Sequence, residues 1–243
     1  MIPLIRAELL KARASRTTRV LVAVTPLFCA LWACLPALMP AASDAVRMAN
    51  VYNMAQQAYV FTMIIGILGM CGEFRHGTIT WSFLASPRRG RVVLAKLAVY
   101  GLVGLAVSAL SALATLVAGA ALLSSQGHPA LSSDVPWVLT GAVLGSTLYA
   151  LLGVGLGALI RHQVGAIALA CLLFMYGDAF LAWLVPDVFR WLPTGAARAL
   201  GGMRLDSGGE LLPAWGGGLL FAGYIAAAVL AARFITLRRD ITG

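Results

Sequence analysis

The chain has 243 residues, of which 60% are hydrophobic and only 11% are charged. Soluble domains carry about 25% charged residues, so this composition excludes an ordinary soluble protein and indicates one membrane-embedded domain over residues 1–243. The net charge of +9 comes from residues that flank the apolar segments, where the positive-inside rule accounts for them. Nucleic acid is therefore not expected as a partner.

The first nineteen residues predict a helix that lies in the membrane interface, running from Ile2 to Thr18. The apolar residues that share one face are Ile2, Ile5, Leu9 and Ala12. The basic residues that lie largely elsewhere are Arg6, Lys11, Arg13 and Arg16. Such a helix holds its basic groups at an anionic leaflet. The alternative is a secretory signal with Val20 onward as its core, which the long basic region and poor cleavage site disfavour.

The first two predicted spans run from Val20 to Pro40 and from Met54 to Gly72, with a polar loop over residues 41–53 between them. Gln56 and Gln57 stand near the start of the second span. Polar side chains at this depth either lie at the outer interface or face a polar pathway. Both interpretations of the two glutamines stay open.

A polar stretch from Gly72 to Lys96 follows the second span and contains five of the eighteen basic residues. Gly77 allows a turn and Thr78 is a good N-cap, so a short amphipathic helix is expected from Thr78 to Ala85, ending before Pro87. A helix pinned between two spans and surrounded by arginines suits docking at the cytoplasmic surface. The predicted docking residues of this segment, 73–91, are Glu73, Arg75, Gly77, Thr78, Ile79, Phe83, Leu84, Pro87, Arg88, Arg89 and Arg91. The alternative is an ordinary positively charged loop.

The order of these residues resembles the permease subunits of ABC type-2 transporters. The positions that carry the resemblance are Glu73, Gly77, Thr78, Phe83, Leu84, Pro87, Arg91 and Lys96. The resemblance implies a coupling helix that fits a groove on a separate ATPase, which binds ATP and Mg²⁺ itself. It also implies two facing permease subunits, as a homodimer or with a paralogue. Glu73 is expected to pair with one of the arginines and so fix the angle of the helix.

The third span lies within Val92 to Leu123, which is longer than a bilayer requires, so this helix is expected to tilt or to protrude. Lys96 is expected to extend its ammonium group back to the lipid headgroups. The remaining spans are predicted at Trp137 to Ile160, Val164 to Val185 and Trp215 to Phe234. Residues 186–214 form an outer, re-entrant-like loop in this interpretation. The expected fold is therefore all-α with six transmembrane helices.

Asp178 is the only carboxylate deep in a predicted span, about 10 Å from the outer end at 1.5 Å per residue. A buried charge is costly in lipid, so Asp178 is expected to face protein or water. It either lines a substrate path beneath a lid over residues 189–200, in which Thr194 caps a short helix, or only bonds to neighbours such as Tyr176. The predicted path residues are Asp178, Gln56, Gln57 and Trp191.

The distribution of charge and of small residues gives two further expectations. With both termini in the cytoplasm of a cell-membrane protein, fourteen of the eighteen Lys and Arg residues lie inside and four lie outside, which follows the positive-inside rule. Small residues at four-residue spacing predict close helix contacts, mostly within one chain. These residues are Gly104, Ser108 and Ala112, then Gly141 and Gly145, then Gly153 and Gly157.

The sequence contains no phosphate-binding loop of the form GxxxxGK[ST], and it contains none of the common protease or hydrolase motifs. Its four cysteines lie in or beside apolar segments and are expected to be unpaired, without a metal site. These features predict a non-catalytic permease that exports a hydrophobic or amphipathic substrate with energy from a separate ATPase, in contact with membrane lipids. The alternative is a non-transporting membrane scaffold or an intramembrane enzyme.

Overall fold

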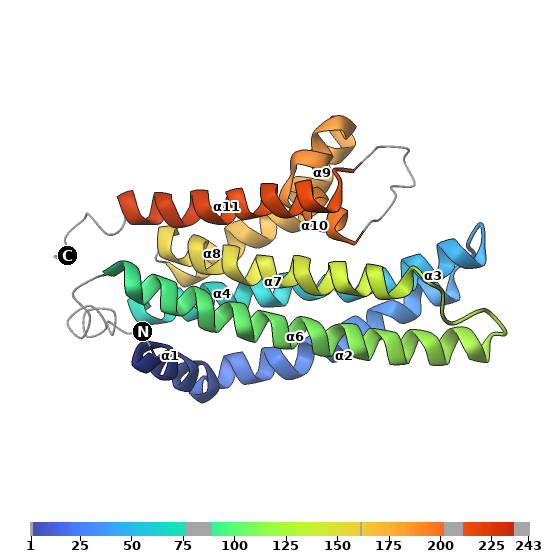
Figure 1. Ribbon diagram of the computed structural model, residues 1–243, viewed down its shortest axis with the longest axis horizontal. Coiled ribbons are helices and arrows are strands. Elements are labelled where there is room, and N and C mark those ends of the chain that lie inside the picture. The colour runs from blue at the N-terminus through green and yellow to red at the C-terminus, as the bar shows by residue number, and fades with distance from the viewer. Residues whose placement is uncertain (1, 76–88, 161, 202–210, 236–243) are drawn as a thin grey trace.

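The computed structural model describes residues 2–75, 89–160, 162–201 and 211–235, and these residues form an elongated bundle of helices (Figure 1). Within the described ranges no strand is present, so the predicted all-α fold is confirmed. The long helices alternate in direction along the bundle, and α1 and the end of α11 lie at the same end (Figure 1). We call this the α1 end, and the opposite one the α3 end.

The elements follow the chain in a simple order. They are α1 (Ile2–Ala14), α2 (Arg16–Leu38), α3 (Asp44–Asn53), η1 (Met54–Gln57), α4 (Ala58–Arg75), α6 (Arg89–Ser125), α7 (Val135–Ile160), α8 (Gln163–Cys171), η2 (Leu172–Gly177), α9 (Asp178–Leu184), η3 (Pro186–Trp191), α10 (Pro193–Leu200) and α11 (Ala214–Ile235). The 37 residues of α6 extend about 55 Å at 1.5 Å per residue, well beyond the roughly 30 Å of a hydrocarbon core.

Five helical segments among the described residues are long and apolar enough to cross a membrane: Arg16–Leu38, Asp44–Arg75, Gly90–Ser125, Val135–Ile160 and Ala214–Ala232. The expected fifth of six spans corresponds to α8, η2 and α9. The apolar helix counted there, Gln163–Gly177, includes the π-helical segment η2 and is shorter than the other five segments. The count of six is therefore not confirmed.

The loop predicted over residues 41–53 is mostly helical, so that prediction is wrong. Ser43 caps α3 by accepting a hydrogen bond from the Val46 amide at 3.3 Å. Met48, Val51 and Tyr52 then form a buried face, and α3 packs on α2, α6 and α7. A ten-residue amphipathic helix was overlooked because its polar residues resembled those of a loop.

The centre of the bundle is a pair of helices, α4 and α7, whose backbones touch through glycine. A Cβ atom on Gly66 of α4 would lie 2.1 Å from the carbonyl oxygen of Ala150 in α7. In return, a Cβ on Gly153 of α7 would lie 2.2 Å from the carbonyl oxygen of Met63 in α4. Such close approach is possible only for residues without a side chain.

The other predicted small residues also form contacts within the chain. Gly157 approaches α4 at Ile67, Gly104 of α6 approaches α7 at Ala150, and Gly141 approaches the end of α10 at Gly201. These contacts confirm the expectation that the small residues pack helices of one chain against each other. They also hold α6 and α10 to the central pair.

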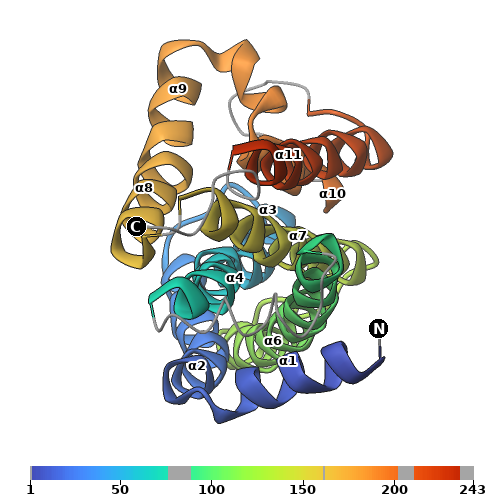
Figure 2. The same cartoon turned by 90° about the vertical axis from the view of Figure 1, so that its left-hand side faces the viewer.

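The helix at the N-terminus is confirmed, but it ends at Ala14, and Ser15 caps a separate α2 by accepting from the Thr18 amide at 3.3 Å. Ile5, Leu9 and Ala12 face the bundle and join a core cluster with α2, α4, α6 and α7, whereas Ile2 is 70% exposed. Figure 2, which views the α1 end, shows α1 running across the bundle beside α6 and α2. The apolar face of α1 therefore packs on protein.

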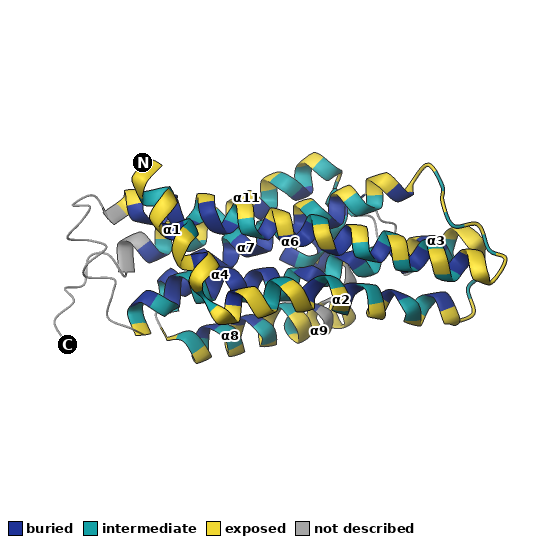
Figure 3. Ribbon diagram, turned by 90° about the horizontal axis from the view of Figure 1, so that it is seen from below, coloured by how far each residue is buried: buried dark blue, intermediate teal, exposed yellow. Residues whose placement is uncertain are grey.

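By contrast, the segment from α8 to α9 lies at the edge of the bundle (Figure 2). The start of this segment contacts α4 and α7, whereas α9 packs mainly on η2 and η3, its neighbours in the chain. Its exposed large apolar residues include Leu172, Tyr176, Phe180, Trp183 and Leu184. The burial view (Figure 3) shows exposed residues along α2, α8 and α9, as expected for faces that meet lipid.

Candidate functional site

Four charged side chains from three helices meet at the α1 end of the bundle. Lys96 of α6 lies with its Nζ atom 2.7 Å from Glu8 of α1 and 3.0 Å from Glu73 of α4. Lys11 of α1 lies 2.8 Å from Glu8 and 2.5 Å from Glu73. The four residues, here called the ion cluster, contain two positive and two negative charges, so they compensate each other.

Burial strengthens the contacts of the ion cluster, and it also means that each buried charge needs a partner of opposite charge. The Lys96 residue is only 1% exposed, and its ammonium group also donates to the Gly69 carbonyl oxygen at 3.1 Å. Burial favours a raised pKa for Glu8, but the charge of Lys96 and hydrogen bonds from Lys11 and Lys96 hold that pKa below its usual value. Burial opposes the charge of Lys11 too, but hydrogen bonds to Glu73 and Glu8 raise its pKa. Their partners in the ion cluster therefore favour the charged forms of Glu8 and Lys11.

The ion cluster corrects one prediction and adds to another. The expectation that Lys96 reaches back to the headgroups is wrong, because two carboxylates surround its ammonium group inside the protein. Glu73 was expected to pair with an arginine of the docking segment, and the structure places it against Lys11 and Lys96. Glu8 was overlooked, although it is the only acidic residue before Asp44 and stands within a basic helix.

The predicted docking helix, residues 78–85, lies entirely outside the described residues, as do Gly77, Pro87 and Arg88. Its two flanks are described. Arg75 ends α4 and donates to the Gln163 side chain at 3.4 Å, and Arg91 is exposed in the first turn of α6. Arg89 begins α6. Both ends of the docking segment therefore start from the helices that the ion cluster ties together.

Asp178 lies directly after the π-helical segment η2 and is 6% exposed. A π-helical segment is rare and changes the direction of the residues that follow it, often at a functional site. Here the Asp178 Oδ2 atom accepts hydrogen bonds from the Thr194 amide at 3.2 Å and the Thr194 hydroxyl at 2.8 Å. The carboxylate thus holds the first turn of α10 against α9.

Thr194 was expected to cap a helix of the lid, and this role is wrong. The short helix exists as α10, but Leu192 is its N-cap residue and Pro193 begins the first turn. The Thr194 hydroxyl instead donates to Asp178. A buried carboxylate on a neighbouring helix therefore replaces the usual capping side chain.

A small polar cavity of about 70 Å³ lies between η1, α4, α7 and α10. Its lining residues are Asn53, Gln56, Gln57, Tyr59, Tyr149, Thr194 and Arg198. Tyr149 is 1% exposed, and its hydroxyl has no hydrogen-bond partner among the described residues. A buried hydroxyl of this kind normally bonds to water or to a ligand. The cavity is large enough for ordered water and offers both donors and acceptors.

The cavity brings together most of the predicted path residues. Gln56 and Gln57 line it directly, and Asp178 reaches its edge through Thr194. Trp191 is half exposed, and its carbonyl oxygen accepts from the Tyr224 hydroxyl at 2.7 Å. It does not line the cavity. Tyr149 and Arg198 were not predicted, because an aromatic residue in an apolar span and an arginine in a loop carry no local signal for such a role.

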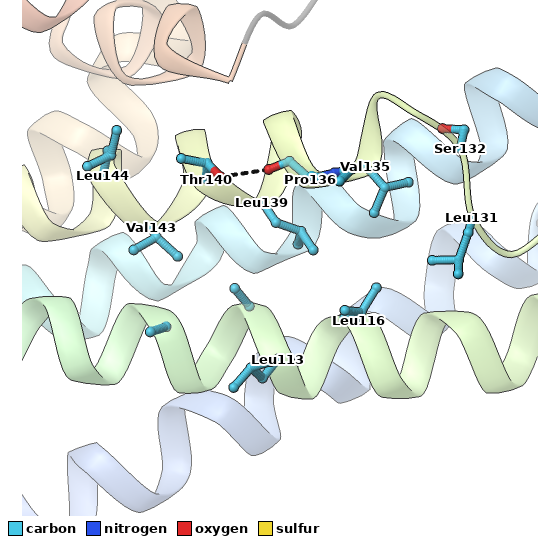
Figure 4. Close-up of a pocket in the computed structure, with 12 residues that line it drawn as sticks. Leu113, Leu116, Leu131, Ser132, Val135, Pro136, Leu139, Thr140, Val143 and Leu144 are labelled. Carbon is cyan, nitrogen blue, oxygen red and sulfur yellow. Dashed lines mark hydrogen bonds between the residues drawn. The ribbon is translucent and has the colours of Figure 1, made fainter.

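A second, apolar groove of about 550 Å³ runs between α6 and α7 toward the α3 end (Figure 4). Leu113 and Leu116 from α6 face Leu139 and Val143 from α7. The hydroxyl of Thr140 is occupied, since it donates to the Pro136 carbonyl oxygen at 2.7 Å. The groove therefore presents a hydrocarbon surface and no charged side chain.

The fold, with five helical segments among the described residues that are long and apolar enough to cross a membrane, defines a multi-pass membrane protein. Residues 4–177 match the family described as ABC-2 family transporter protein, which covers more than half of the chain, so the protein belongs to this family. It is a permease subunit of an ABC transporter. A search among curated proteins finds no match.

Proposed function

We propose that the protein exports a hydrophobic or amphipathic substrate and that a separate ATPase drives it by docking on the segment of residues 73–91. The ion cluster is the observation that carries the proposal. Glu73 is the first residue of this segment, and Lys96 lies shortly after its end. Glu73 contacts Lys11 of α1, Lys96 contacts Glu8 of α1, and Glu73 and Lys96 contact each other. Because the ion cluster joins these helices, a displacement of the docked segment then moves α1, α4 and α6 together.

The docking is tested by replacing the apolar pair Phe83 and Leu84 with Asp. We expect this variant to insert normally and to lose co-purification with the ATPase, because an apolar groove does not accept carboxylates. Leu131→Asp is the matched control, since Leu131 is 67% exposed in the loop at the opposite end. Association that survives in the double variant contradicts the docking assignment.

The proposed orientation places both termini and the docking segment in the cytoplasm. It is supported by the excess of basic residues at the α1 end. Reporter fusions at Ser132 and Gly208 are expected outside, and a fusion at Gly90 inside. An inside signal at Gly208 contradicts the arrangement of the last two membrane segments.

The substrate class is proposed from the two surfaces described above. The apolar groove between α6 and α7 suits a hydrocarbon portion, and the polar cavity suits a hydrogen-bonding group. A second permease copy or a paralogue would complete the path. Transport of an amphipathic dye by proteoliposomes containing the permease and its ATPase tests this class, and failure with every amphipathic probe but success with a small hydrophilic solute contradicts it.

A further inference from the structure

A third hollow lies where α1, α2 and α6 meet, and it differs from the other two in combining an apolar floor with basic residues. It has a volume of about 370 Å³. The residues that line it are Leu9, Ala12, Arg13, Thr18, Arg19, Val22, Leu102, Val103, Ala106 and Val107. We call it the α1 notch, because the chain turns beside it at Ser15, between α1 and α2.

The floor of the α1 notch is buried and apolar. Ala12 and Val107 are buried, and they belong to the same core cluster as Leu9, Val22 and Val103. The wall on α6 is open to the side, since Leu102 is 60% exposed. An apolar hollow that opens sideways from a membrane helix is accessible to an acyl chain.

Two arginines, Arg13 of α1 and Arg19 of α2, lie at the edge of this hollow and are exposed. Among the described carboxylates none forms an ion pair with either guanidinium, since Glu8 and Glu73 are engaged with Lys11 and Lys96. The two guanidiniums are thus available to an anion. Arginine binds phosphate through two parallel hydrogen bonds.

The height of the α1 notch in the membrane agrees with a lipid ligand. Arg19 stands one turn into α2, which crosses the membrane from Arg16 to Leu38. Its guanidinium therefore lies near the headgroups, whereas Val22 of α2 and Ala106 of α6 lie on the hydrocarbon side. We infer that the α1 notch binds one anionic phospholipid, with an acyl chain in the hollow and the phosphate on Arg13 and Arg19.

The test compares two charge-matched double variants of the full-length chain. Arg13→Gln with Arg19→Gln removes both arginines of the notch. Arg6→Gln with Arg16→Gln removes two exposed arginines from the same two helices that do not line it. Both variants lose the same net charge, so general attraction to anionic lipid falls equally. A difference in lipid binding between the two variants therefore measures binding at the α1 notch itself.

Native mass spectrometry of the detergent-purified protein measures retention of dioleoyl phosphatidylglycerol and, separately, of dioleoyl phosphatidylethanolamine. We expect the wild type to retain one phosphatidylglycerol preferentially. The Arg13 and Arg19 variant is expected to weaken this binding about tenfold, which equals about 1.4 kcal/mol. The Arg6 and Arg16 variant is expected to bind as the wild type does. Equal losses in the two variants, or equal retention of both lipids by the wild type, overturn the proposal.

Two further measurements test the acyl chain. Ala106→Phe fills the hollow without changing charge, and we expect it to lower phosphatidylglycerol retention as strongly as loss of the arginines. Unchanged retention in this variant overturns the placement of the chain. Soluble glycerol phosphate is expected not to compete, and effective competition by it shows a phosphate site without a lipid. Circular dichroism confirms that each variant remains helical.

Discussion

Replacing Lys96 by Met removes one positive charge from a position that is only 1% exposed. Lys96 contacts Glu8 at 2.7 Å and Glu73 at 3.0 Å, so the variant takes one of the two cations of the ion cluster away from both carboxylates. Removing one partner of a buried pair costs about 3–5 kcal/mol because the remaining charge is uncompensated. That is a large part of the roughly 5–15 kcal/mol by which proteins are stable.

The free energy of unfolding is measured by SDS titration of the purified protein in mixed micelles. Arg91→Met is the matched control, because Arg91 is exposed in the first turn of the same helix, and a change within about 0.5 kcal/mol is expected. The double variant Lys96→Met with Glu8→Gln restores electrical neutrality, so we expect it to regain at least half of the loss. The reasoning is refuted if Lys96→Met lowers the free energy of unfolding no more than Arg91→Met does. It is also refuted if adding Glu8→Gln to Lys96→Met lowers that free energy further.

The remaining predictions concern pH, helix contact and the polar cavity. Because the folded pKa of Glu8 is held below its usual 4.5, its stabilising contribution is fully present above about pH 4.5 and is lost as the pH falls further; a Glu8→Gln variant should lose this acid sensitivity in thermal unfolding. Gly153→Ala places a Cβ 2.2 Å from a backbone oxygen of α4 and should cost about 1–3 kcal/mol. Gly223→Ala, where nothing lies within 4 Å, should instead be neutral or stabilising, and equal effects of the two contradict the contact. Asp178→Asn keeps an acceptor for Thr194, so we expect normal folding with reduced transport and substrate-stimulated ATPase activity; wild-type activity shows that the charge has no role in the path.

Composition and apolar length were sufficient to predict the membrane class, the all-α fold and most helix positions. They failed at α3, where Ser43 and Asp44 begin a helix whose polar residues resemble a loop. They also failed to predict η2, because a π-helical segment arises from how a helix packs and has no residue pattern of its own.

The site was predictable where its residues are close in sequence and not where packing brings them together. Glu73 and Lys96 were recognised from one local motif, but their contacts with α1, to Lys11 and to Glu8, span 62 and 88 residues and depend on how α1 crosses the bundle. Asp178 was recognised because a carboxylate in a span is unusual, yet its partner Thr194 is sixteen residues away, on another helix.

The glycine contacts between α4 and α7 restrict how this transporter can move. Each backbone lies in a depression of the other at two points, so sliding or rolling by even part of a helical turn drives a larger residue against a carbonyl oxygen. We therefore expect the two helices to move as one body. Any rearrangement of the bundle is then expected to displace other helices around this pair, such as the segment from α8 to α9 at the edge of the bundle.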